Sequence, residues 1–140
     1  MTDQLGHILV VEDDQANLEL TIDLLEVAGF DVLGAPDAET GIAIARRVLP
    51  DLILMDIGLP GMDGIAAADV LRNDVRTRHI PVVAATSHAM KGDQENIVSA
   101  GFFGYIPKPI DTRTFAATVA SLLRSRRAGK DVQHVSRSRS

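Results

Sequence analysis

Three acidic side chains follow two apolar segments that lie far apart in the chain. Glu12 and Asp13 come directly after residues 7–11, and Asp56 comes after residues 52–55. Two carboxylates about 4 Å apart repel each other by about 4 kcal/mol at an effective dielectric constant near 20, so such a cluster needs a cation or a shared proton. An all-oxygen cluster suits a hard cation, and Mg²⁺ is the first candidate.

The same acids also have a purely structural interpretation. Glu12, Asp13 and Asp14 could begin a loop and cap the helix that follows it, because acidic side chains stabilise helix N-termini. For Asp14 we expect this capping role rather than a role as a ligand. The spacing alone leaves both interpretations open for Glu12 and Asp13.

The composition indicates one domain. The chain has 140 residues, of which 46% are hydrophobic, which is enough for one well-buried core. It has no cysteine, which excludes disulfides, thiol nucleophiles and thiolate metal sites, and no apolar run reaches the roughly 18 residues of a membrane span. The start of the chain lacks the pattern of a secretory signal, so we expect a cytoplasmic protein with no membrane partner.

Charge is distributed unevenly along this chain, whose formal net charge is -5. The last segment, residues 124–140, is rich in serine and arginine, contains Asp131 as its one acid and has few large apolar side chains. Such composition is typical of disorder. We therefore expect an N-terminal extension over residues 1–6, a folded domain over 7–126 and a basic, disordered tail over 127–140.

Apolar runs of strand length predict the elements that position the acids. Residues 8–11, 52–55 and 81–85 are apolar without alternation, so both faces of these strands should be covered. Two further strands are expected at 31–35 and 104–106.

Five helices are expected between and after these strands, because apolar residues recur there at helical spacing. The pattern is carried by Leu18, Ile22 and Leu25, by Ala38, Ile42, Ala45 and Leu49, by segments 64–71 and 90–100, and by Phe115, Val119 and Leu122. This alternation predicts a single α/β domain with a doubly wound, five-stranded parallel sheet. In such sheets ligands bind at the carboxyl ends of the strands.

Two more polar residues, Thr86 and Lys108, follow predicted strands and should lie at the same edge as the acids. An acidic pair after the first strand, Asp56 after the third, Thr86 after the fourth and Lys108 followed by Pro109 after the fifth together resemble a response-regulator receiver domain of the CheY-like fold. The resemblance covers roughly residues 6–126. Within the family, segments 80–86 and 89–93 are most similar to single-domain receivers of the cell-cycle DivK type and to receivers of hybrid kinases.

The resemblance implies a stand-alone receiver in a two-component phosphorelay. Asp56 would accept a phosphoryl group from a sensor histidine kinase or a histidine phosphotransferase, and the module would catalyse only its own phosphorylation and dephosphorylation. Mg²⁺ would be held by Asp13, by Asp56 and by the backbone carbonyl of Gly58, with Glu12 reached through water. Lys108, turned inward by a cis peptide bond to the proline after it, would contact a phosphoryl oxygen.

The resemblance also implies a switch. Thr86 would hydrogen-bond the phosphoryl group and Tyr105 would be its aromatic partner, and the output would be phosphorylation-dependent binding of an effector protein. Gly58, which has no side chain to shield the phosphoryl group, and His88, which could order the attacking water, would tune the lifetime of the acyl phosphate. A half-buried tyrosine and a solvated loop histidine are the structural alternatives for Tyr105 and His88.

Two other classes of function use similar residues. A haloacid-dehalogenase-type phosphatase also forms an aspartyl phosphate, but it needs a second Asp two residues after the nucleophile, where this chain has Gly58. A nucleic-acid-binding regulator could use the Arg-rich tail, but we expect too few residues after the last helix for a reader domain. The tail could instead contact the acidic body of a second copy, which leaves a homodimer open.

Overall fold

The strands of the computed structural model form one parallel sheet, and the structure describes residues 5–58, 62–86, 97 and 99–129. The sheet order is β2-β1-β3-β4-β5. The strands are β1 (His7–Val11), β2 (Asp31–Ala35), β3 (Leu52–Asp56), β4 (Val82–Thr86) and β5 (Gly104–Pro107). The order reverses at β1, which confirms the predicted doubly wound sheet.

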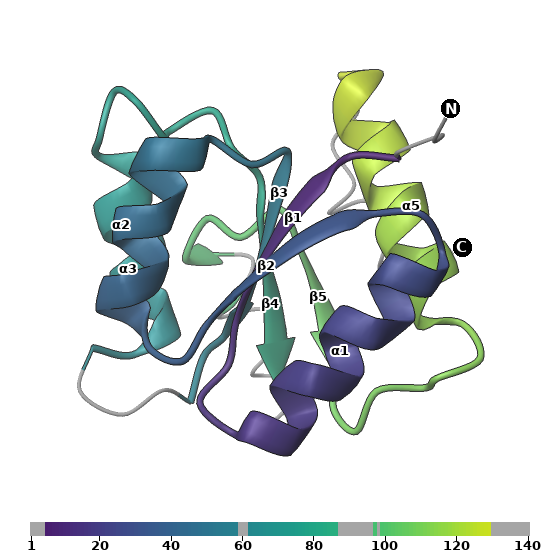
Figure 1. Cartoon of the computed structure of the whole chain (residues 1–140). Helices are drawn as coiled ribbons and strands as arrows, with labels where there is room; N and C mark the ends of the chain where they lie inside the picture. Colours follow the sequence, from purple (N-terminus) through teal and green to yellow (C-terminus); the bar gives the residue numbers. More distant parts are fainter. Residues whose placement is uncertain (1–4, 59–61, 87–96, 98, 130–140) are drawn as a thin grey trace.

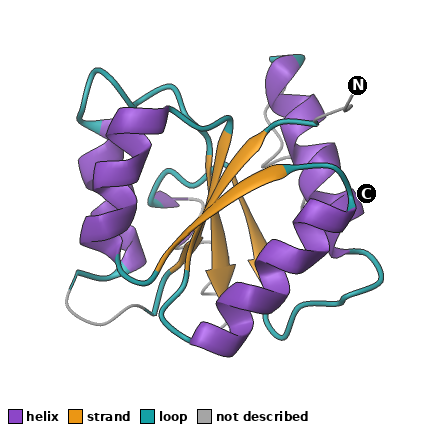
Figure 2. Ribbon diagram, in the orientation of Figure 1, coloured by secondary structure: helices purple, strands orange, loops and turns teal. Residues whose placement is uncertain are grey.

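Helices cover both faces of the sheet. They are α1 (Gln15–Val27), α2 (Ala38–Val48), α3 (Gly64–Arg72) and α5 (Phe115–Arg127). Figures 1 and 2 show α2 and α3 on one face and α1 and α5 on the other. Of the helix predicted over 90–100, Ile97 and Ser99 are helical, and most of its other residues lie outside the described ranges.

Each face of the sheet buries its own apolar cluster. In β1, Leu9 and Val11 pack in the cluster with α2 and α3, whereas Ile8 and Val10 pack in the cluster with α1 and α5. This division follows from the two-residue period of a strand, and coverage on both sides explains why the central strands read as unbroken apolar runs. All five residues of β3 are buried.

Aspartates begin three of the helices. Each accepts a hydrogen bond from the backbone N–H three residues further on, which satisfies a donor that the helix itself leaves unpaired. The pairs are Asp14 with Asn17, Asp37 with Thr40, and Asp63 with Ala66. The capping role predicted for Asp14 is therefore confirmed.

Helix α2 ends earlier than its apolar pattern predicted. Leu49 was expected in the buried stripe, but it has φ 55° and ψ 64° after the last helical residue and is 48% exposed. Proline disfavours the helical conformation in the residue before it, and Pro50 follows directly. The prediction for Leu49 was wrong because this local effect outweighs the helical period.

The first strand and the last helix lie near the two ends of the predicted domain, and β1 begins at its first residue, His7. Helix α5 extends to Arg127, so the boundary predicted at residue 126 falls in its last turn. Most residues of the predicted N-terminal extension and tail lie outside the described ranges. Among the residues that the structure describes, no helix has the length and apolar character needed to cross a membrane.

The loop after α3 is tied to α2 through Asp74, whose side chain is only 12% exposed. Its carboxylate accepts hydrogen bonds from Arg76 through the backbone N–H at 2.9 Å and the guanidinium Nη2 at 2.9 Å, and from Arg46 Nε at 2.8 Å. These bonds, with Arg76 contributing most, hold the pKa of Asp74 well below its ordinary range.

We expect Asp74→Asn to lower the free energy of unfolding at neutral pH and to have a smaller effect in acid. A carboxylate with a lowered folded-state pKa stabilises the fold above its unfolded-state pKa of about 3.9, and that stabilisation is lost as the pH falls towards the folded-state value. Urea unfolding across this range measures the difference. The control is Asp69→Asn, which changes a carboxylate that is 63% exposed. The prediction would be contradicted if the difference in free energy of unfolding between the wild type and Asp74→Asn did not become smaller in acid.

Candidate functional site

The carboxyl ends of β1 and β3 bring three predicted site residues together. The two strands are neighbours, with Val11 paired to Met55, so Glu12 and Asp56 extend from adjacent positions. One carboxylate oxygen from each of Glu12, Asp13 and Asp56 lies within 4.8 Å of the others. Glu12 and Asp56 are buried, whereas Asp13 is exposed, so the cluster has one open side.

Lys108 enters this acidic cluster from the end of β5. Its Nζ lies 3.0 Å from Glu12 Oε1 and 3.4 Å from Asp56 Oδ2. The peptide bond to Pro109 is cis, as predicted, and the backbone N–H of Lys108 donates to the carbonyl of Thr86 at 2.7 Å. The closer contact, to Glu12, was not predicted, because nothing in the sequence links two residues 96 positions apart.

Burial and charge oppose each other in this cluster. Burial raises the pKa of Glu12 above its ordinary value and the charge of Asp56 adds to the rise, although hydrogen bonds from the backbone N–H of Asp14 and from Lys108 act against it. Burial alone would lower the pKa of Lys108, but the two carboxylates beside it raise the pKa overall. Lys108 therefore stays charged at neutral pH.

The donor set of the cluster fits a divalent cation. Three carboxylates and one ammonium together carry net negative charge, which a divalent ion would balance. The donors are oxygens, which Mg²⁺ prefers, and the exposed carboxylate of Asp13 offers a side from which an ion and its waters can enter.

Two glycines shape the site in ways that were not predicted from the sequence. The backbone N–H of Gly58 donates to Asp56 Oδ1 at 2.9 Å and so fixes the rotation of that carboxylate. Gly64 begins α3 directly against the end of β3, where a Cβ would lie 2.6 Å from the carbonyl oxygen of Asp56 and from the Cα of Ile57. No pattern in the sequence indicates the hydrogen bond from Gly58. The close approach at Gly64 could have been suggested by the position of this glycine immediately after a helix cap.

Thr86 and Tyr105 lie on neighbouring strands. Thr86 ends β4 and is 1% exposed, and Tyr105 is half-buried in β5 against the cluster that contains Ala84. Ala84 pairs with Tyr105, and Thr86 with Pro107, so the period of the strands puts the Thr86 and Tyr105 side chains on the same face of the sheet. Their switch roles stay predictions, and His88 lies outside the described residues.

Comparisons with known proteins agree with one another. The family profile of the response regulator receiver domain matches residues 8–120. The polar-differentiation response regulator DivK of Brucella anthropi is 41% identical over 116 residues, which cover 83% of this chain and 94% of that protein.

Solved structures with the same fold cover most of the chain. The receiver domain of a sensor histidine kinase from Pseudomonas aeruginosa, with a magnesium ion coordinated in its active-site cleft, is 32% identical with a TM-score of 0.78, covering 86% of this chain and 98% of that one. A CheY-like receiver domain protein from Methanospirillum hungatei is 28% identical with a TM-score of 0.80, covering 90% of this chain and 99% of that one.

Proposed function

Since the chain belongs to the response regulator receiver domain family, we propose that it accepts a phosphoryl group on the carboxylate of Asp56. Proteins of this family are signalling modules rather than conventional enzymes. The observation that carries the proposal is the position of Asp56: its Oδ2 lies 3.4 Å from Lys108 Nζ, inside a cluster with the oxygens of Glu12 and Asp13. The donor would be a phosphohistidine of a sensor kinase or phosphotransferase.

In the proposed reaction an oxygen of Asp56 attacks phosphorus in line with the bond to the donor nitrogen. The new O–P bond forms as the P–N bond breaks, and the electron pair of the broken bond stays with the imidazole, which takes up a proton. Such a loose transition state needs positioning and charge neutralisation more than covalent help. Gly58 N–H orients the attacking carboxylate, and the Lys108 ammonium is close enough to meet a phosphoryl oxygen bound to it.

Asp13, Asp56 and the backbone carbonyl of Gly58 would hold Mg²⁺ directly, and Glu12 would hold it through water. Bound there, the ion supplies positive charge to the carboxylates and to the phosphoryl oxygens. The net negative charge and the all-oxygen donor set support this assignment. So does the related kinase receiver, which has magnesium in its cleft.

The proposal also covers the response of the protein to phosphorylation. Thr86 would contact the phosphoryl group and Tyr105 would respond, which would change the affinity for an effector protein. Gly58 and His88 would set the rate at which the protein hydrolyses its own acyl phosphate. A stand-alone role is supported by the match to nearly the whole length of DivK. A cytoplasmic location and the absence of a nucleic-acid partner stay predictions.

Labelling with a small phosphodonor tests this function. We expect the protein to gain one phosphoryl group from acetyl phosphate when Mg²⁺ is present, to lose it in hydroxylamine, and to gain none in EDTA. Intact mass measures the product. Asp13→Asn should need about tenfold or more Mg²⁺ for the same labelling, because it removes a charge attraction of a few kcal/mol.

The matched control for Asp13→Asn is Asp23→Asn, which changes an exposed aspartate in α1 and should need no more Mg²⁺ than the wild type. Labelling of Asp13→Asn at the wild-type Mg²⁺ concentration would show that Asp13 does not hold the ion. Labelling of the wild type in EDTA would remove the metal from the proposal altogether.

A further inference from the structure

The free edge of the sheet carries an apolar cleft that the proposed function does not use. Among the residues that the structure describes, strand β2 is the edge strand and pairs with β1 alone. In Figure 1 it crosses the front of the molecule between the two helix layers. A cavity of about 210 Å³ opens beside it, between the strand and α2, and its apolar wall includes Leu9, Leu33, Ile44 and Val48.

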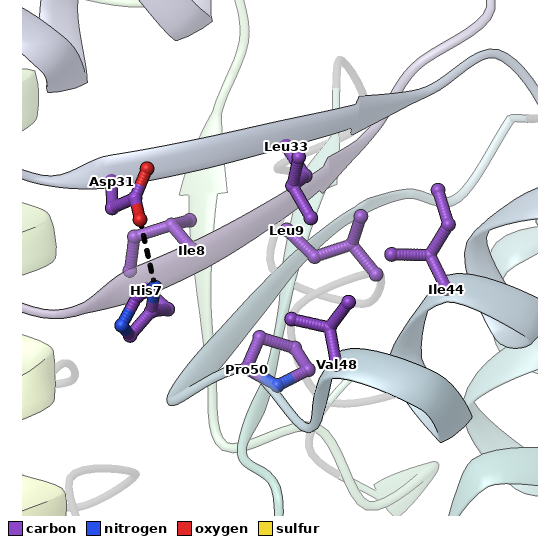
Figure 3. Close-up of a pocket in the computed structure, with 8 residues that line it drawn as sticks. All are labelled: His7, Ile8, Leu9, Asp31, Leu33, Ile44, Val48 and Pro50. Carbon is purple, nitrogen blue, oxygen red and sulfur yellow. Dashed lines mark ion pairs between the residues drawn. The ribbon is translucent and has the colours of Figure 1, made fainter.

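Two of the large apolar side chains that line this cleft are exposed. Leu33, at the centre of β2, is 45% exposed, and Val48, at the end of α2, is 39% exposed. Figure 3 shows both pointing into the same hollow, with His7 and Asp31 at its rim. His7 Nδ1 lies 3.1 Å from Asp31 Oδ2, so these two polar groups at the rim pair with each other. A free strand edge with exposed apolar side chains is a site for strand pairing.

Charge along α2 shows what kind of strand would fit. Thr40, Ile44 and Arg47 follow one another at spacings of four and three residues, so they form one stripe on the side of α2 where Ile44 lines the cleft, and Asp37, the N-cap of α2, stands at the start of this stripe. The stripe is acidic at its first residue and basic at its last. Asp37 accepts a hydrogen bond from Thr40 N–H, whereas Arg47 is exposed and has no ion pair among the described residues.

We propose that the β2 edge binds the β2 edge of a second copy of this chain, antiparallel, around a two-fold axis near Leu33. The rotation joins the two sheets into one and keeps both clefts on the same face, where Leu33, Ile44 and Val48 from each copy close them. It also turns the α2 stripes antiparallel, so Arg47 of each copy lies towards Asp37 of the other. Because the surface complements itself under this rotation, a second copy fits better than an unrelated strand.

Oligomeric state tests the proposal, and sedimentation velocity over a range of concentrations measures it. We expect the wild type to form dimers as its concentration rises. Leu33→Lys should be monomeric over the same range, because it places two ammonium groups together in the joined cleft. Val75→Lys is the matched control: Val75 is 70% exposed and lies in the loop after α3, and this variant should dimerise like the wild type.

A second pair of variants tests the same interface without changing its apolar wall. Arg47→Glu should weaken dimerisation by up to about tenfold. The substitution removes the contact of Arg47 with Asp37 of the other copy, and the two-fold axis makes this contact occur twice in the dimer. Arg124→Glu, which changes an exposed arginine in α5, should leave dimerisation unchanged. Circular dichroism shows whether each variant is folded. Phosphorylation by acetyl phosphate is measured separately, so a failure of the proposed function can be told apart from a failure of this proposal.

Two results would overturn the proposal. One is a wild type that stays monomeric at every concentration, which would assign the cleft to some other occupant, such as a strand of a different protein. The other is a dimer that persists in both Leu33→Lys and Arg47→Glu, which would place the interface elsewhere on the molecule.

Discussion

Asp56→Asn is expected to gain no phosphoryl group from a small phosphodonor under conditions that label the wild type fully. The substitution removes the nucleophile, because an amide oxygen is a far weaker nucleophile than a carboxylate. It preserves the size of the side chain, and the amide oxygen can still accept the hydrogen bond that Gly58 N–H gives to Asp56 Oδ1 at 2.9 Å. The fold should therefore persist, and the loss should be chemical.

The measurement for Asp56→Asn is intact mass after incubation with acetyl phosphate and Mg²⁺, followed by treatment with hydroxylamine. Asp23→Asn, in an exposed position, should label like the wild type and controls for the loss of one acid. A hydroxylamine-labile adduct on Asp56→Asn would move the acceptor to another carboxylate, and the neighbours within 4.8 Å, Glu12 and Asp13, would be the first candidates.

The sequence predicted the sheet well because coverage on both faces makes the signal strong. Strand β3 is buried along its whole length, and its first four residues form an apolar run that no solvated segment resembles. The acid-bearing edge followed from the parallel topology, since carboxyl ends of adjacent strands meet. Leu49 was missed because a proline next to it outweighed the helical period.

Other features depend on distances that no local pattern encodes. Lys108 is closer to Glu12 than to Asp56, at 3.0 Å against 3.4 Å, and this difference arises from how β5 and β1 are placed by the intervening strands. The hydrogen bond from Gly58 N–H could come from any residue except proline. The sequence around Leu33 is typical of a strand and does not indicate that its side chain is exposed. That exposure follows only from the position of β2 at the edge of the sheet.

Lys108→Met is expected to slow phosphorylation and, at the same time, to tighten Mg²⁺ binding. The ammonium is a charge-assisted donor worth about 1.5–3 kcal/mol to a charged partner, so its loss should slow labelling by about 10- to 100-fold. The same charge competes with a cation for Glu12 and Asp56, at 3.0 Å and 3.4 Å, and removing it makes the cluster more negative. Methionine fills similar space in a position whose side chain is only 19% exposed.

Two measurements separate these opposite effects of Lys108→Met. The rate of labelling by acetyl phosphate at saturating Mg²⁺ reports the loss at the phosphoryl group, and calorimetric titration reports the gain in Mg²⁺ affinity. Lys108→Arg is the matched control, because it keeps the charge but replaces a compact ammonium with a planar fork. It should bind Mg²⁺ like the wild type and still label more slowly. If Lys108→Met labelled at the wild-type rate, Lys108 would have no part in neutralising the phosphoryl group, and its place between Glu12 and Asp56 would be structural.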